Sequence, residues 1–375
     1  GLTRPETSEE MAETLMKLTG YLLNELATAE TRVYNLAYGM SQAGWSWGPT
    51  ALKAIKKNKP KHAPTNNFDG LKVWNHLSEW EEDTPPPPPG HLNIDPAEIA
   101  ERLMQLLENK TENRPQQIEY AIAIANAFAE SKNETTPKTV IAEAGTGVGK
   151  TLGYLAPASV WADKNQGSVW ISTFTRNLQR QLNNELNQLY PDPIEKSVRT
   201  VIRKGRENYL CLLNLEESIG QSSANHKSDQ KNIDLITLGL VARWLHASKD
   251  GDMIGGDFPA WLSDLMGRHR TIDLTDTRGE CIYSACNHYS KCFIEKSVRR
   301  ARRARLVIAN HALVMIQSVL TDDLYRPNRY IFDEGHHIFD AADNAFSTHL
   351  TGIETSDLRR WIMGSEGKKY SRARG

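Results

Sequence analysis

Residues 139–151 read TVIAEAGTGVGKT, and this stretch decides the fold. Its first four residues predict a strand, and the glycines that follow predict a turn whose backbone amides surround phosphate oxygens. Lys150 would bring a positive charge to the outer phosphates, and the Thr151 hydroxyl would ligate magnesium. The motif departs from the usual phosphate loop at its first position, where Ala144 replaces glycine. The candidate nucleotide-binding residues are Gly145, Thr146, Gly147, Val148, Gly149, Lys150 and Thr151.

A chance glycine-rich turn is the alternative, and the preceding strand together with the lysine and threonine argues against it. A second apolar strand, at residues 330–332, ends in Asp333-Glu334-Gly335-His336. At a strand tip, Asp333 can hold magnesium and Glu334 can polarise an attacking water. Four such residues also fit a surface turn, but the phosphate loop upstream favours the catalytic interpretation.

Short apolar strands alternate with helical stretches in the middle of the chain, which predicts a parallel sheet with right-handed crossovers. The predicted strands are residues 139–142, 168–172, 198–202, 306–309 and 330–332. A helix is predicted ahead of them at residues 96–109. Between residues 202 and 306 the alternation gives way to polar, cysteine-bearing sequence that is far longer than a crossover needs. We interpret this stretch as an inserted domain.

The first part of the chain predicts a small helical module, since Met11, Leu15, Leu18, Leu22 and Leu26 share one helical face. The prolines at 85–89 predict a stiff spacer after it.

The tryptophans of this module interleave with lysines, and the two kinds of side chain together could stack on and hold a single strand of nucleic acid. The favoured alternative is a small apolar core with a solvated lysine face. The residues concerned are Trp45, Trp47, Trp74, Trp80, Lys53, Lys56, Lys57, Lys59 and Lys61.

The composition indicates a multidomain globular protein. The chain has 375 residues, 45 Lys and Arg against 46 Asp and Glu, and a net charge of -1, so any nucleic-acid surface must be local. Neither a membrane span nor a signal pattern is expected, and we predict a cytoplasmic protein. The first residue is Gly1 instead of methionine, which we expect of a chain that is part of a longer protein.

The four cysteines all lie in the predicted insertion, at Cys211, Cys281, Cys286 and Cys292. In a cytosolic chain they are expected to act together as metal ligands, because disulfides do not persist there. Structural zinc favours short paired knuckles, whereas these spacings are loose and one thiol is remote. The spacing therefore favours an iron-sulfur cluster, with zinc and unligated cysteines as the alternatives.

The segment 204–211, KGRENYLC, resembles the start of the cluster domain in the iron-sulfur superfamily 2 DNA helicases of the DinG and XPD type. Four further motifs follow the order of that family: the phosphate loop, the cysteine spacing, VIANHAL at 307–313 and the acidic box at 333–336. The resemblance covers roughly residues 113–350. It implies an ATP-dependent DNA helicase of 5′-to-3′ polarity with ATP, Mg²⁺ and a 4Fe-4S cluster as cofactors. Its implied partners are single-stranded DNA and a DNA duplex or fork.

The same resemblance implies roles for smaller features. Arg114 and Gln117 correspond to an adenine-reading element, and His336 to a coupling residue. Residues 173–181 correspond to a DNA-contacting segment, for which a capped helix start is the alternative. The candidate DNA-binding residues are Thr173, Thr175, Arg176, Gln179, Lys204 and Arg206. The basic run 299–305 equally fits a DNA contact and a solvated or ion-paired helix face.

We therefore expect an α/β fold: a parallel-sheet P-loop (RecA-like) helicase lobe, an inserted, mostly helical iron-sulfur domain, and an N-terminal helical module. The expected boundaries are 1–83 for the module, 84–91 for the linker, 92–204 and 301–340 for the lobe, 205–300 for the cluster domain, and 341–375 for the start of an arch-like insertion. A second motor lobe is expected to be absent, so the segment alone should be inactive as a motor.

Two other functions compete with this interpretation. A recruited helicase subunit, resembling the CRISPR-associated DinG helicases of type IV systems, would dock on a larger nucleoprotein effector complex through its N-terminal module. A DinG-like exonuclease would need an acidic metal cluster ahead of the motor. Residues 1–83 offer only helical glutamates for such a cluster, which disfavours the exonuclease.

Overall fold

The structure is a computed structural model, which describes residues 7–27, 49, 53, 72–80, 84–107, 115–129, 137–145, 147–224, 229–276, 281–320, 327–347, 352, 355 and 358. The chain divides into two units, and it passes through each of them twice. Unit 1 comprises Gly1–Trp80 and Arg206–Phe293, and unit 2 comprises Glu81–Gly205 and Ile294–Gly375. Among the described residues, no helix combines the length and apolar character needed to cross a membrane.

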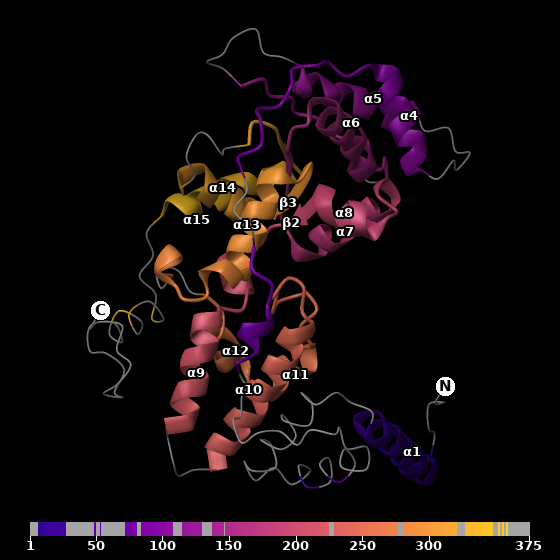
Figure 1. The fold of residues 1–375 in the computed structure, drawn as a ribbon. Coiled ribbons are helices and arrows are strands. Elements are labelled where there is room, and N and C mark those ends of the chain that lie inside the picture. The colour runs from indigo at the N-terminus through magenta and orange to yellow at the C-terminus, as the bar shows by residue number, and fades with distance from the viewer. Residues whose placement is uncertain are drawn as a thin grey trace. The chain divides into compact units, whose positions relative to one another are not determined.

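A four-stranded, all-parallel sheet forms the centre of unit 2 (Figure 1). The strands are β1 (Val169–Thr173), β2 (Thr200–Ile202), β3 (Leu306–Asn310) and β4 (Tyr330–Phe332), in the order β2-β3-β1-β4. In register, Ile171 of β1 lies opposite Ile308 of β3 and Ile331 of β4. All five residues of β1 are buried, as expected for a parallel strand that is covered on both faces. The predicted parallel α/β fold is confirmed.

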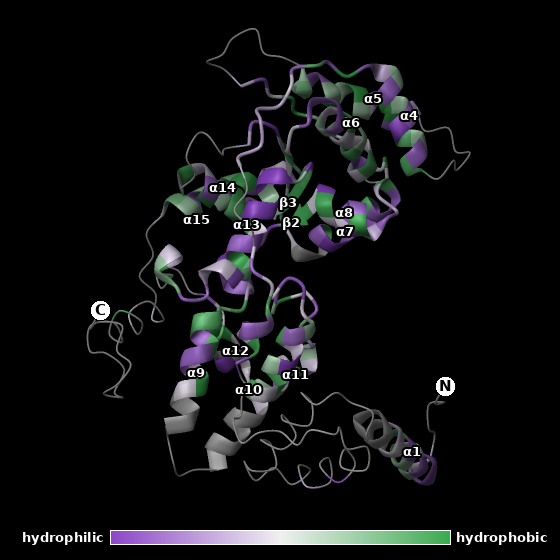
Figure 2. Cartoon of the chain, in the orientation of Figure 1, coloured by the Kyte–Doolittle hydropathy of each residue, from purple (hydrophilic) through white to green (hydrophobic). Residues whose placement is uncertain are grey.

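Helices cover both faces of this sheet. They are α4 (Pro96–Leu106), α5 (Pro115–Ala125), α6 (Lys150–Asn165), α7 (Arg176–Leu189), α8 (Pro193–Arg199), α13 (Phe293–Arg303), α14 (His311–Leu320) and α15 (Ile338–Phe346), with 3-10 turns η3 (Asn126–Phe128) and η8 (Gly335–His337). One core, around Ile171 and Ile308, includes side chains of α4 to α7. The other, around Trp170 and Val307, includes side chains of α13 and α14. The sheet region is accordingly coloured as largely hydrophobic in Figure 2.

Unit 1 is mostly helical in its described part. Its elements are α1 (Ser8–Ala27), η2 (Val73–His76), η4 (Arg206–Asn208), α9 (Leu212–Ala224), α10 (Asp229–Ala247), α11 (Ala260–Met266), α12 (Arg268–Asp273), η5 (Tyr283–Ala285) and η6 (Tyr289–Lys291). The predicted N-terminal helix is confirmed as α1, but its expected apolar face is exposed at Met11 (52%) and Leu15 (56%). Trp45 and Trp47 lie outside the described residues.

The segment 72–80 packs against the cysteine-bearing insertion within unit 1. η2 contacts α10, and the buried Trp74 ring lies 5.3 Å from the ring of His288. The Trp80 backbone N–H donates to Ser290 O (2.8 Å), and its indole Nε1 donates to Tyr289 O (2.7 Å). Trp74 and Trp80 are therefore packing residues of the insertion, whereas the rest of the predicted module is largely outside the described residues.

The predicted strand at 139–142 is wrong, since these residues belong to neither a helix nor a strand. Ile141 is 95% exposed. A strand is stabilised by the hydrogen bonds of its neighbours, and four apolar residues without a partner strand carry only local propensity.

The predicted strand at 198–202 begins two residues later than expected, at Thr200. The reason is α8, which precedes the strand. Asp192 is the N-cap of this helix, where its side chain accepts a hydrogen bond from Ile194 N, and Pro193 occupies the first helical position. This start signal extends the helix through Val198 and Arg199. The other strands lie within one residue of their predicted bounds.

Candidate nucleotide site

The glycine-rich loop leads directly into α6. Gly147 and Gly149 have φ angles of 92° and 82°, which favour glycine, and Gly149 is the N-cap of α6 without a side-chain cap. The first amides of α6 are thus free of a capping side chain, as an anion-binding helix start requires. Gln117 braces the loop, because its buried Nε2 donates to Gly149 O at 2.8 Å. Thr146 and Arg114 lie outside the described residues.

The acidic turn after β4 lies next to this loop. Lys150 Nζ is 3.6 Å from Glu334 Oε1, and the Tyr154 hydroxyl donates to Asp333 Oδ2 at 3.2 Å. The Asp333 backbone N–H donates to Ser172 O at 2.8 Å, which fixes the turn to the end of β1. The structure therefore brings together the three side chains for which the sequence predicts phosphate, magnesium and water roles.

Burial is the main influence on the Asp333 carboxyl. Burial raises its pKa, the Tyr154 hydrogen bond lowers it, and the charge of Glu334 raises it again. The pKa of Tyr154 is in turn raised well above its usual value, first by burial and then by the charge of Asp333. Burial disfavours the charged form of Asp333, and a divalent cation bound to this carboxylate would stabilise that form.

Two histidines flank the acidic turn. His336 Nδ1 lies 3.6 Å from Glu334 Oε2, so the predicted coupling residue contacts the predicted water-activating residue. The buried His311 shares a 2.6 Å hydrogen bond between its Nδ1 and Ser172 Oγ. Sequence reasoning gave no role to Tyr154, Ser172 or His311. A signal existed for Tyr154, which lies one helical turn after Lys150 and so shares its face of α6.

The candidate DNA-binding residues are only partly placed for contact with a ligand. Thr173 and Gln179 are buried, and Thr175 Oγ1 caps α7 by accepting from Leu178 N at 3.2 Å. Arg206 pairs with the buried Asp276 at 2.5 Å and lies over the Tyr283 ring. Only the backbone of Arg176 is described, and Lys204 is half-buried. The capped helix start is therefore present, and a DNA role for these side chains stays a prediction.

Side chains of the basic run 299–305 make contacts within unit 2 at several positions. Arg299 Nε pairs with Glu295 at 2.9 Å, and Arg300 Nη2 donates to Ser197 O at 2.8 Å. These contacts favour the ion-paired alternative for this part of the run.

The four cysteines lie in unit 1, half-buried and without a disulfide. Burial, partly offset by hydrogen bonds from the backbone of Asn214 and Leu213 and reinforced by the charges of Asp276 and Cys292, raises the pKa of Cys211 to about 12. Within the described residues no set of three or more His, Cys, Asp or Glu side chains is arranged to hold a metal ion. Four cysteines in one unit fit the chemistry of a thiolate-ligated group, and the iron-sulfur cluster stays a prediction.

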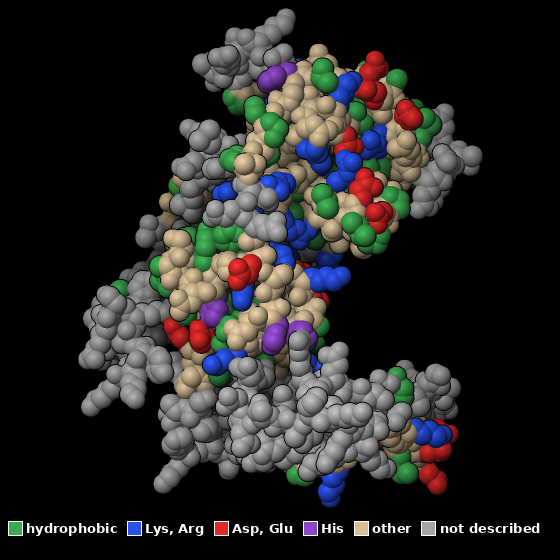
Figure 3. Space-filling model, viewed as in Figure 1, with side chains coloured by type: hydrophobic (Ala, Val, Ile, Leu, Met, Phe, Trp, Pro, Cys, Tyr) green, Lys and Arg blue, Asp and Glu red, His purple; other side chains and the backbone are tan. Residues whose placement is uncertain are grey.

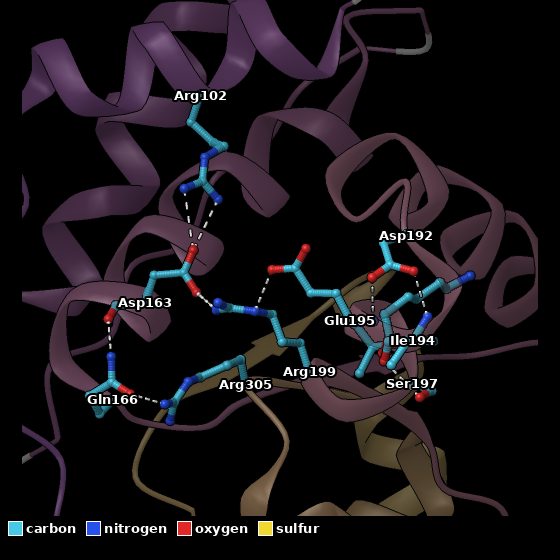
Figure 4. A network of polar contacts seen from close by, with 11 residues as sticks. Arg102, Asp163, Gln166, Asp192, Ile194, Glu195, Ser197, Arg199 and Arg305 are labelled. Carbon is cyan, nitrogen blue, oxygen red and sulfur yellow. Dashed lines mark hydrogen bonds and ion pairs between the residues drawn. The ribbon is translucent and has the colours of Figure 1, made fainter.

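A cavity of about 360 Å³ lies in unit 2 away from the phosphate loop, where α6, α7 and α8 meet α4. Asp163 joins Arg102 (3.2 Å) and Arg199 (2.7 Å) on its wall (Figure 4). The residues that line it are Arg102, Gln105, Asp163, Gln166, Leu189, Tyr190, Glu195 and Arg199. Acidic and basic side chains are interspersed over this part of the surface in Figure 3. Lys150 is the first residue of α6, whereas Asp163 lies in its last turn and Gln166 is its C-cap, so the cavity lies at the opposite end of this helix from the phosphate loop.

The parallel four-stranded sheet with helices on both faces is consistent with a P-loop type of lobe. Over 250 residues the chain is 33% identical to the ATP-dependent DNA helicase YoaA of Haemophilus influenzae, a match that covers 65% of this chain and 36% of that protein. Over 276 residues it is 30% identical to the ATP-dependent helicase DinG of Mycobacterium tuberculosis, covering 70% of this chain and 38% of that protein. The chain is a relative of the DinG-like helicases.

A Bacillus subtilis protein named 3'-5' exonuclease DinG is also similar, with 29% identity over 249 residues that cover 65% of this chain and 24% of that protein. No family model matches the chain. The chain spans 36% and 38% of the length of the YoaA and DinG helicases it matches, so the similarity concerns about a third of each.

Proposed function

We propose that this chain is the ATP-binding first lobe of an ATP-dependent DNA helicase that moves 5′-to-3′ along single-stranded DNA. One observation carries the proposal: the glycine-rich loop and the acidic turn meet at one edge of a parallel sheet, with Lys150 Nζ 3.6 Å from Glu334 Oε1. The helicase names of the similar proteins support it.

The contact between Lys150 and Glu334 suggests how the site would change on binding ATP. Both side chains are about one-third exposed, at 33% and 38%, so their pairing is weak. The triphosphate would attract Lys150 more strongly than one carboxylate does, and Glu334 would then be free to orient the attacking water. Asp333 and Thr151 would hold the magnesium ion, which supplies charge stabilisation at the transferred phosphate.

Two substitutions in the complete protein test the proposal. Lys150→Ala should reduce ATP hydrolysis by about a hundredfold or more while DNA binding survives, because charge stabilisation of this kind is worth several kcal/mol. Glu334→Gln should retain Mg-ATP binding and lose turnover. ATP hydrolysis and unwinding are measured beside nucleotide and DNA affinity. Unwinding by Lys150→Ala at a tenth of the wild-type rate, or loss of ATP affinity in Glu334→Gln, would contradict these roles.

We further propose that this lobe alone binds nucleotide without translocating, because translocation requires two lobes that close on ATP and open after hydrolysis. Adding a second lobe, as part of the complete protein, should restore DNA-stimulated hydrolysis. Stimulated hydrolysis and movement by residues 1–375 alone would refute this.

We propose that Cys211, Cys281, Cys286 and Cys292 hold a 4Fe-4S cluster, giving the mostly helical insertion a resident cofactor. The support is the presence of all four cysteines, without a disulfide, in this one unit. When bound, such a cluster would contribute folding free energy to the insertion. The protein's own contribution is to pack the segment 72–80 against His288 and Tyr289, in the loop between Cys286 and Cys292.

A further inference from the structure

An aromatic stack joins the end of β1 to the acidic turn. Phe174 directly follows β1, at the start of the segment that resembles a DNA-contacting element, and it is 47% exposed. Its ring lies parallel to that of His337, with ring centroids 3.6 Å apart and an angle of 11° between the planes. This contact connects two segments that are far apart in the sequence.

A continuous series of contacts leads from this stack to the phosphate loop. The His337 ring lies 4.0 Å from the ring of His336, whose Nδ1 is 3.6 Å from Glu334 Oε2. The other oxygen of Glu334 is 3.6 Å from Lys150 Nζ. The His337 N–H also donates to Glu334 O at 3.1 Å, so His337 and Glu334 belong to one tight turn.

Buried hydrogen bonds also join the end of β1 to the acidic turn and to the start of α14. Ser172 accepts the Asp333 N–H through its carbonyl (2.8 Å) and bonds to His311 through its hydroxyl (2.6 Å), and Ser172 and His311 are buried. By contrast, Phe174 is 47% exposed and its partner His337 is half-buried. The stack is therefore the part of this connection that an arriving ligand can displace.

Glu334 adds a second reason why the turn can change. Its φ of 54° and ψ of 50° place a non-glycine residue in the left-handed region. Such a conformation is strained and persists only where surrounding contacts hold it.

We propose that the Phe174–His337 stack couples DNA binding at the end of β1 to the position of Glu334 in the ATP site. This inference rests on the function proposed above and names positioning residues for it. A DNA strand that contacts the segment after β1 moves Phe174, His337 follows, and the turn that carries His336 and Glu334 shifts relative to Lys150. By linkage, ATP must then change DNA affinity by the same factor as DNA changes ATP affinity.

The test measures ATP hydrolysis by the complete protein with and without saturating single-stranded DNA. His337→Ala should keep basal hydrolysis within about twofold and lose DNA stimulation by about three- to tenfold, the range expected for one aromatic pair. His337→Phe should restore stimulation because it retains the stack. Phe346→Ala, which removes a 67% exposed ring from α15, is the matched control and should behave as wild type.

A double-mutant cycle with Phe174→Ala tests whether the two rings act together on DNA stimulation, which separate structural roles would not require. If the two rings act through one another, the double variant loses no more stimulation than either single variant. A non-hydrolysable ATP analogue should also change single-stranded DNA affinity in wild type and not in His337→Ala. Additive losses, or full stimulation in His337→Ala, would overturn the coupling. A wild type without DNA stimulation would instead overturn the proposed function itself.

Discussion

Gly149→Ala is a sharp test of the phosphate loop, because the structure separates two costs of adding one methyl group. Gly149 has a φ of 82° and a ψ of 43°, a left-handed conformation that alanine adopts at a cost of roughly 1–2 kcal/mol. Its new Cβ would also collide with Gln117 Nε2, the group that donates to Gly149 O. Gly147→Ala is the matched control. It has a φ of 92°, and within the described part of the chain nothing lies within 4 Å of its added Cβ.

The two variants should differ in ATP affinity, because only Gly149→Ala brings a Cβ against Gln117 and breaks the Gln117 hydrogen bond to the loop. Gly147→Ala should weaken ATP binding by roughly five- to thirtyfold through backbone strain alone. Gly149→Ala adds a cost of about 1–3 kcal/mol, because Gln117 must leave a buried, hydrogen-bonded position. Its ATP affinity should therefore be lower than that of Gly147→Ala by a further factor of about 5 to 150.

Calorimetric titration with a non-hydrolysable ATP analogue measures these affinities, and thermal unfolding controls for global damage. The double variant Gln117→Ala/Gly149→Ala should recover part of the loss because the collision is removed. Equal affinities for Gly147→Ala and Gly149→Ala would refute the reasoning, since Gln117 would then not be packed on the loop.

Three further outcomes are expected. Burial raises the pKa of Tyr190 to about 12, while an unfolded tyrosine ionises near pH 10, so wild type should lose up to roughly 2–3 kcal/mol of stability as pH rises through that window. Tyr190→Phe should lack this loss in urea unfolding, and equal pH slopes would contradict it. Anaerobically purified protein should contain about four irons per chain and lose them in Cys286→Ser, whereas stoichiometric zinc would exclude the cluster. Trp80→Ala should speed amide exchange at Tyr289 and its neighbours through a local loss of roughly 2 kcal/mol, and Trp261→Ala, at a 58% exposed position, should not.

Sequence alone predicts the sheet well where a strand is buried on both faces. β1 begins with the apolar run 169–171 and β3 with the apolar run 306–309, and such runs between helical stretches favour a buried strand. The segment 139–142 has the same local character and still forms no strand, because pairing depends on neighbours that local sequence does not encode. The β-branched Val198 favoured a strand, but it lies in α8, because the helix start at Asp192 and Pro193 is the stronger signal.

The candidate site divides in the same way. Lys150, Asp333 and Glu334 could be predicted because each belongs to a motif whose spacing is local. The residues that contact them do not belong to these motifs. Tyr154 shares a helix face with Lys150, and Ser172 and His311 meet only because the parallel strands β1 and β3 end side by side. Trp74 and Trp80 were read as parts of a separate module, and no local pattern links them to a loop some two hundred residues later.

That separation has a consequence for how the chain is made. Trp80 Nε1 donates to Tyr289 O across 209 positions of sequence, so Trp80 leaves the ribosome long before its partner exists. At about 5–20 residues per second, the interval is roughly 10–40 seconds. During that time the Trp80 indole has no Tyr289 carbonyl to donate to, and it is accessible to chaperones and to other nascent chains. The insertion can therefore be completed only after Tyr289 is made, by capturing a segment that was synthesised about two hundred residues earlier.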